Sequence, residues 1–132
     1  MIKIYQEIVD ADNGDCLRAC ICSLLGLENT SVIPNFGDYP DNNFWIKVNE
    51  WTKPNIGYSF IPAMYSKMLV SLIKGFYCIA VGPVHRGPQN HAVIIADEKI
   101  IHDPHPSNAG LIEISYIVIP VFIGFYQGGD VN

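Results

Sequence analysis

The chain carries little charge, and positive charge is the scarcer kind. Of its 132 residues, 16% are charged, and 13 acidic side chains against 8 basic ones give a net charge of −5. Lys and Arg form no cluster anywhere in the sequence. A nucleic-acid-binding surface must neutralise phosphates with basic groups, and an anionic membrane surface attracts the same groups. We therefore expect neither nucleic acid nor a membrane as a partner.

Long apolar segments are also missing. The N-terminus has no extended apolar region followed by a small-residue cleavage site, which argues against a secretory signal. The most apolar stretch, residues 111–126, contains Glu113, Ser115 and Pro120 and is shorter than the roughly 20 residues of a membrane-spanning helix. Hydrophobic residues still make up 49% of the chain, enough for a buried core. The sequence thus predicts a soluble, cytoplasmic protein folded as a single domain over residues 1–132.

Cysteines are few and are not spread as a disulfide framework would need. Cys16, Cys20 and Cys22 share one short segment, and Cys78 lies far from them. This spacing lacks the paired C-x2-C knuckles of a structural zinc site. We expect Cys20, Cys22 and Cys78 to be buried free thiols, which are common in protein cores. No cofactor and no metal are expected.

The order of the predicted elements favours an α+β fold, with helices first and an antiparallel sheet after them. The expected helices cover residues 17–25 (ended by Gly26), 42–52 (ended by Pro54) and 63–74. The expected strands cover residues 58–61, 76–81, 91–96 and 99–102, with one or two more in 111–126 interrupted near Pro120 and a short strand at best in 1–6. Residues 27–43 and 82–90 are expected to be loops.

Three residues could form a nucleophilic relay. Cys16 opens an apolar helix, whose N-terminus favours a thiolate. His91 opens an apolar strand, so its imidazole can face a cleft and act as a general base and acid. Asp103 ends the next strand and can orient that imidazole. A three-residue hairpin loop over 96–98 would put Asp103 across from His91 on one face of the sheet, whereas a two-residue loop would put them on opposite faces.

Attack by a cysteine on a carbonyl gives a tetrahedral intermediate with a negatively charged oxygen, and this oxyanion needs hydrogen-bond donors. The backbone N–H of Cys16 is one candidate, and a side-chain amide from Gln6 or its rival Asn13 is the other. Asp15 or Asn13 is also a plausible N-cap of the helix.

The residues that carry this chemistry resemble the papain-like cysteine peptidases, and within them the C39-like group. The resemblance rests on Asp15-Cys16-Leu17-Arg18-Ala19-Cys20, His91-Ala92-Val93-Ile94 and Asp103-Pro104, which follow one another in the family's order. It implies a papain-like fold with Cys16 as nucleophile, His91 as base and acid, Asp103 as orienting group and Gln6 as oxyanion donor. Two positions depart from the family: Gln6 lies further before Cys16, with Asp10 nearer to it, and Leu17 stands where a Gly is frequent.

The chain also resembles a set of small stand-alone bacterial and phage proteins. The shared segments are Gly14-Asp15-Cys16-Leu17-Arg18-Ala19-Cys20-Ile21, Asn90-His91-Ala92-Val93 and His102-Asp103-Pro104-His105-Pro106-Ser107. Residues around these motifs are the candidates for substrate binding: Asn13, Asp15, Arg86, Asn90, His105 and Ser107. Among them Arg86 is suited to a carboxylate or a phosphate.

We therefore predict a thiol-dependent hydrolase that cleaves a peptide or isopeptide bond, with a peptide or protein as substrate. A transglutaminase-like acyl transferase would use the same residues. A non-catalytic protein that binds a ligand or partner on the same scaffold is the alternative from another class. A metal cluster of His85, His91, His102, Asp103 and His105 is a weaker alternative. Trp45 and Trp51 are expected to pack in the core rather than line a cleft.

Overall fold

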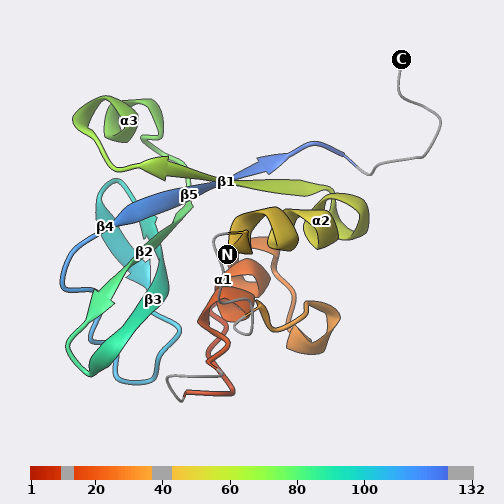
Figure 1. Cartoon of the computed structure of the whole chain (residues 1–132), viewed down its shortest axis with the longest axis horizontal. Coiled ribbons are helices and arrows are strands. Elements are labelled where there is room, and N and C mark those ends of the chain that lie inside the picture. Colours follow the sequence, from red (N-terminus) through yellow and green to blue (C-terminus); the bar gives the residue numbers. More distant parts are fainter. Residues whose placement is uncertain (10–13, 37–42, 125–132) are drawn as a thin grey trace.

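The computed structural model describes residues 1–9, 14–36 and 43–124, and within them the fold is α+β, as the sequence predicts. The helices are α1 (Cys16–Leu25), the 3-10 helix η1 (Thr30–Val32), α2 (Phe44–Ile56) and α3 (Lys67–Leu72). The strands are β1 (Tyr58–Met64), β2 (Cys78–Val84), β3 (Gly87–Ala96), β4 (Lys99–His102) and β5 (Tyr116–Phe122). They form one antiparallel sheet in the order β1-β5-β2-β3-β4 (Figure 1).

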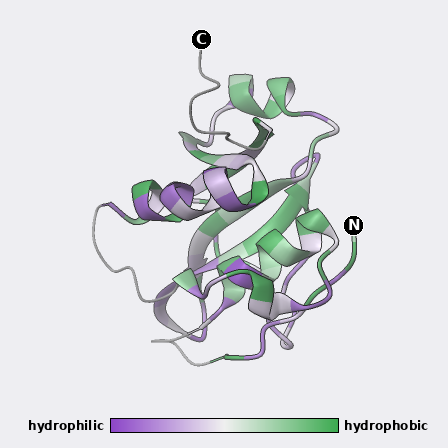
Figure 2. Ribbon diagram, turned by 90° about the vertical axis from the view of Figure 1, so that its right-hand side faces the viewer, coloured by the Kyte–Doolittle hydropathy of each residue, from purple (hydrophilic) through white to green (hydrophobic). Residues whose placement is uncertain are grey.

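Helix α1 carries apolar residues on nearly all sides, so it lies between the sheet and other chain segments. Its side chains from Leu17 to Cys22 are mostly buried, and it packs against β3. The helix ends at Gly26, whose φ of +69° is a left-handed conformation that a side chain would disfavour. Apolar residues concentrate on α1 and the central strands (Figure 2).

The sheet has an apolar core on each face. On one face, α1 and α2 cover residues such as Ile79, Ala92, Ile94 and Val118. On the other face, α3 covers a smaller cluster. The smaller cluster consists of Cys78, Ala80, Val93, Ile95 and Ile117. The described part of the chain contains no helix long and apolar enough to cross a bilayer.

Two predicted helices have different bounds from those expected. Helix α2 continues through Pro54 to Ile56, because a proline in the exposed last turn loses only one main-chain hydrogen bond before the helix ends at Gly57. Residue 42 lies outside the described residues. The helix expected over 63–74 is only Lys67–Leu72, because residues 63 and 64 pair with β5 and extend β1.

Three other stretches also differ from expectation. Residues 1–6 form no strand and lie along α1, with the Ile4 N–H bonded to Ser23 Oγ at 2.9 Å. Residues 82–90 are largely strand, because β2 and β3 continue as a hairpin to Val84 and Gly87. Pro120 does not interrupt β5. The pairing of β5 with β2 stops at Val118, so Pro120 has only β1 beside it and no central ladder bond is lost.

In the β3–β4 hairpin, a two-residue turn and a bulge together place Asp103 on the same face of the sheet as His91. The turn has two residues, Asp97 and Glu98, whose φ values of +49° and +67° are those of a tight hairpin turn. Of the two loops considered from the sequence, the two-residue one is present, but the opposite faces expected from it are not. A bulge after the pair Ile95–Ile100 brings Ile94 opposite His102, so the strand slips by one residue. That slip returns Asp103 to the same face as His91.

Candidate active site

Cys16 is the first residue of α1 and is partly exposed. The first helical hydrogen bond runs from the Ala19 N–H to the Asp15 carbonyl at 3.0 Å, so the main-chain N–H groups at the start of the helix precede the helical ladder. The side chain of Cys16 lies close enough to His91, which is 75 positions later in the sequence, to raise the pKa of the imidazole by hydrogen bonding and by charge. The structure thus places the predicted nucleophile beside the predicted base, at the N-terminus of a helix.

His91 is held by hydrogen bonds on both sides of its ring. It is 3% exposed, and its Nε2 lies 2.7 Å from Oδ1 of Asp103. Because Nε2 is taken by Asp103, Nδ1 is the ring nitrogen that remains for Cys16. Burial by itself lowers the pKa of His91, but the hydrogen bonds and charges of Asp103 and Cys16 outweigh it and raise the pKa above 6.5. The site therefore favours an imidazolium beside the sulfur.

Asp103 is a buried carboxylate that every neighbouring contact keeps ionised. Besides His91, it accepts the main-chain N–H of His105 at 2.9 Å and that of Gly110 at 2.8 Å. Burial raises the pKa of Asp103, but these three hydrogen bonds and the charge of His91 lower it to about 2. At neutral pH the carboxylate is charged and fixes the orientation of the imidazole.

A glycine that sequence reasoning missed makes room for this arrangement. Gly82 of β2 pairs with His91 across the hairpin. A Cβ placed on Gly82 would lie 2.0 Å from the carbonyl oxygen of Glu113. The segment carrying Glu113 is fixed on each side by bonds from Ile112 N to the Pro83 carbonyl and from Ser115 N to the Val81 carbonyl, both at 2.8 Å. Only a residue without a side chain fits opposite His91, and nothing local in the sequence indicates this.

Asp15 occupies the N-cap position of α1, but its side chain turns away from the helix. It is 1% exposed, and it accepts the main-chain N–H groups of Glu7 at 3.2 Å and Ile8 at 3.0 Å. Its other oxygen forms an ion pair with Arg18 at 2.9 Å. The carboxylate that we predicted to bind substrate therefore fastens the N-terminal segment to the start of α1.

Gln6 lies in this fastened segment, next to the loop that carries Asp103. Its main-chain N–H donates to the Pro104 carbonyl at 2.9 Å, and its Nε2 donates to the Ile8 carbonyl at 3.0 Å. An amide nitrogen has two hydrogens, so Nε2 retains one more donor. The segment thus passes between α1 and the Asp103 loop despite its distance from Cys16 in the sequence. The rival, Asn13, lies outside the described residues.

The remaining substrate-binding candidates lie on the β2–β3 hairpin and in the loop after β4. His105 lies with its ring perpendicular to that of His91, at a centroid distance of 6.1 Å. Ser107 bonds to the His105 ring, with its main-chain N–H 3.0 Å from Nδ1. Arg86 is exposed between β2 and β3, and Asn90 is exposed one residue before His91. Burial and the positive charges of Arg86 and His91 lower the pKa of His105.

The metal alternative is not supported. His102 is buried and its Nε2 contacts the Ile4 carbonyl at 2.6 Å, while His85 is exposed at the tip of the β2–β3 hairpin. Within residues 1–9, 14–36 and 43–124, no group of three or more His, Cys, Asp or Glu side chains is placed to hold a metal ion.

The other three thiols are unsuited to nucleophilic chemistry. Cys20, Cys22 and Cys78 are free and buried, as the sequence predicts. Burial raises the pKa of each, in Cys22 to about 11. The Cys20 thiol contacts the Ala92 carbonyl at 3.5 Å. Trp45 and Trp51 pack against the core as predicted, although Trp45 also lines a surface pocket between α2 and β1.

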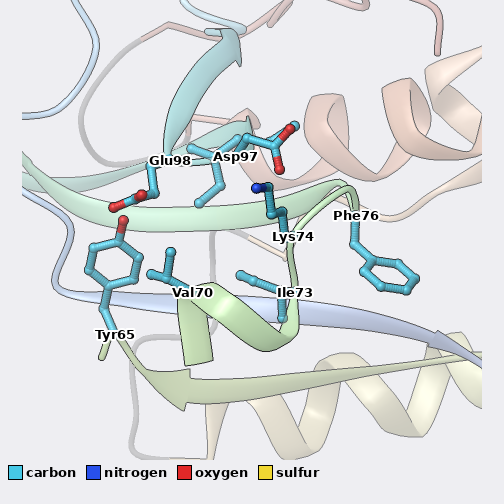
Figure 3. A pocket seen from close by; sticks show the side chains of 9 residues that line it. Tyr65, Val70, Ile73, Lys74, Phe76, Asp97 and Glu98 are labelled. Atoms are coloured by element: carbon cyan, nitrogen blue, oxygen red, sulfur yellow. The ribbon is translucent and has the colours of Figure 1, made fainter. Parts of the chain in front are cut away.

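A small pocket lies far from this site. It has a cavity volume of ≈ 10 Å³ between α3 and the β3–β4 turn, and Tyr65, Ile73, Lys74 and Asp97 are among its lining residues (Figure 3). This is below the roughly 300–1,000 Å³ of typical ligand sites. Its lining includes Ile95 and Ala96 at the end of β3 but neither Cys16, His91 nor Asp103, so it plays no part in the chemistry above.

Comparisons with protein-family models, with curated proteins and with solved structures found no match to this chain.

Proposed function

We propose that the chain is a thiol-dependent hydrolase of the papain-like, C39-like type, acting on a peptide or isopeptide bond. The observation that carries the proposal is the 2.7 Å hydrogen bond between His91 and Asp103, with Cys16 near enough to the same imidazole to raise its pKa. The three residues come from a helix start, a strand and the loop after the next strand, which is the order in which the resembling family places them. A nucleophile, a base and a group that orients the base are the parts that acyl transfer requires.

The chemistry proceeds through a thioester on Cys16. The thiolate attacks the carbonyl carbon of the amide, and the negative charge that develops on oxygen is met by the helix N-terminal N–H groups. The C–N bond then breaks, and His91 gives its proton to the leaving nitrogen. Water attacks the thioester carbon while His91 takes one of the water protons. The C–S bond breaks, and the released Cys16 thiolate again pairs with the His91 imidazolium.

Each supporting residue has a defined part in this scheme. Asp103 keeps the His91 ring in one orientation and stabilises its positive charge. Gln6 supplies an amide donor from the fastened N-terminal segment, with its free N–H as the second oxyanion contact. Asp15 keeps that segment against α1.

Selective alkylation tests the proposal. Iodoacetamide at pH 6, followed by peptide mapping, is expected to modify Cys16 and to leave Cys20, Cys22 and Cys78 unmodified, because burial raises the pKa of those three thiols. His91→Ala is expected to abolish the modification, whereas His85→Ala, at an exposed histidine, leaves it unchanged. Equal and slow labelling of all four thiols in the folded protein would overturn the proposal in favour of a non-catalytic binding protein.

Hydrolysis itself is tested with a mixed peptide library in water enriched in ¹⁸O. The expected products carry one ¹⁸O atom in a new carboxyl group, and Cys16→Ser and His91→Ala remove them. Products in which an added amine replaces water would instead identify an acyl transferase.

A further inference from the structure

The residues beside His91 point to the charge of the substrate, and this inference rests on the proposed function. His105 is rigidly placed: Asp103 accepts its main-chain N–H at 2.9 Å, and prolines precede and follow it. Its Nδ1 receives the main-chain N–H of Ser107 at 3.0 Å. A nitrogen that accepts a hydrogen bond carries no proton, so the ring proton sits on Nε2. His105 thus presents an N–H donor next to the ring of His91.

Arg86 adds a permanent positive charge at the same place. It lies beyond the pairs Gly82–His91 and Pro83–Asn90, at the tip of the hairpin that carries His91, and its charge reaches His105. The chain has two arginines, and the other, Arg18, is paired with Asp15. The ion pairs within the described part of the chain are Arg18–Asp15 and His91–Asp103, so Arg86 has no carboxylate partner there. In a chain with a net charge of −5, an unpaired guanidinium beside the candidate site is distinctive.

The position of this pair selects one side of the substrate. His91 delivers its proton to the leaving nitrogen, so the residue that carries this nitrogen passes beside the imidazole. The ring centre of His105 lies 6.1 Å from that of His91, so a residue that passes beside the His91 imidazole comes within reach of His105. A guanidinium with a neighbouring N–H donor matches the two oxygens of a carboxylate.

We infer that Arg86 and His105 form a subsite for a carboxylate on the leaving-group side of the scissile amide. The substrate then ends in a free main-chain carboxylate just after the scissile bond, or has Asp or Glu at that position. Both sources present the same chemical group to the pair.

Two alkylating agents that differ only in charge test the subsite. Iodoacetate carries a carboxylate and iodoacetamide does not. With either reagent the thiolate sulfur bonds to the methylene carbon and iodide leaves. In the full-length protein, Arg86→Gln and His105→Phe are expected to lower the ratio of the iodoacetate rate to the iodoacetamide rate at Cys16, by roughly threefold or more for Arg86→Gln. Lys67→Gln removes an exposed cation from α3, on the other face of the sheet, and is expected to leave the ratio unchanged.

The outcomes separate the subsite from the proposed function. If iodoacetamide labels Cys16 in a His91-dependent way but the ratio does not respond to Arg86→Gln, the subsite is overturned and the hydrolase stands. If neither reagent labels Cys16 selectively, the hydrolase is overturned and the subsite with it. A ratio that falls equally in Lys67→Gln is a general charge effect and also overturns the subsite.

Protection of Cys16 from iodoacetamide distinguishes the two carboxylate sources. N-acetylalanine carries only a main-chain carboxylate, and N-acetylglutamic acid α-amide carries only a side-chain carboxylate. Protection by the first supports a substrate that ends after the scissile bond, and protection by the second supports an internal Asp or Glu. Equal protection by uncharged N-acetylalanine amide would contradict an anionic subsite.

Discussion

At the scale of single residues, the site is defined by the hydrogen-bond partners of each side chain. Asp103 has three hydrogen-bond donors around it, and His91 has a partner on each ring nitrogen. These contacts outweigh the cost of burying a carboxylate and an imidazole together. Residue identity and order predicted the three partners, because Cys, His and Asp at the starts and ends of predicted elements are chemically specific.

The charge of Asp103 is expected to control the ionisation of His91. In Asp103→Asn the carboxylate is replaced by a neutral amide, so the desolvation of the buried imidazole is no longer offset by that charge and the pKa of His91 falls. NMR titration of the His91 ring signals measures this, with Asp97→Asn as a control on the exposed β3–β4 turn. An unchanged His91 titration in Asp103→Asn would contradict the hydrogen-bonded pair.

Asp15 is expected to matter for stability. Asp15→Asn keeps the side-chain volume but leaves Arg18 without its ion-pair partner and turns an amide N–H2 toward the donors of residues 7 and 8. We expect a loss of about 2–4 kcal/mol in the free energy of unfolding, measured in urea. Glu28→Gln, at an exposed carboxylate, is the control. A loss as small as that of the control would show that the buried contacts do not form.

At the scale of elements, short-range patterns predicted α1 and the core of β2 and β3 because each has a continuous apolar run. The same patterns predicted the wrong bounds for elements that are extended by pairing with another strand. Residues 63–64 follow a helical spacing, yet they lie in β1 because β5 supplies a partner. Residues 82–84 look like a turn, yet they lie in β2 because β3 pairs with them.

Gly82→Ala is expected to disrupt the hairpin that carries His91. Its Cβ would lie 2.0 Å from the Glu113 carbonyl oxygen, and this segment is fixed by main-chain bonds on both sides. We expect a loss of about 2–3 kcal/mol in the free energy of unfolding, because backbone must shift.

The matched control is Gly75→Ala. A Cβ there meets no atom within 4 Å, so only its φ of +87° opposes the substitution, at about 1 kcal/mol. Urea unfolding compares the two variants, and equal losses would refute the close approach at Gly82.

At the scale of the whole molecule, the site links stability to pH. The pKa of Asp103 falls from 3.8 to about 2 on folding, so its contribution is present above pH 3.8 and is lost as the pH falls through about 2. The shift corresponds to about 2 kcal/mol. The pKa of His91 is raised, so its contribution is present below pH 6.5 and is lost as the pH rises through the folded value.

The stability of Asp103→Asn is therefore expected to approach that of the unchanged protein as the pH falls from about 5 to 2. Urea unfolding at several pH values measures the difference between the two proteins, which isolates Asp103 from the other carboxylates. Glu28→Gln serves as the control, since it removes an exposed carboxylate. A difference for Asp103→Asn that stays constant with pH would contradict the buried ion pair.

The sequence by itself determined the α+β class, the apolar helix behind Cys16, the buried thiols and the three residues of the candidate relay. These follow from local periodicity and side-chain chemistry. The tertiary structure alone decided the register that joins His91 to Asp103, because a two-residue turn and a bulge act together across two strands. It also decided the role of Asp15, the need for glycine at position 82 and the effect of the Arg86 charge on the pKa of His105, since each depends on segments that are distant in the chain and near one another only after folding.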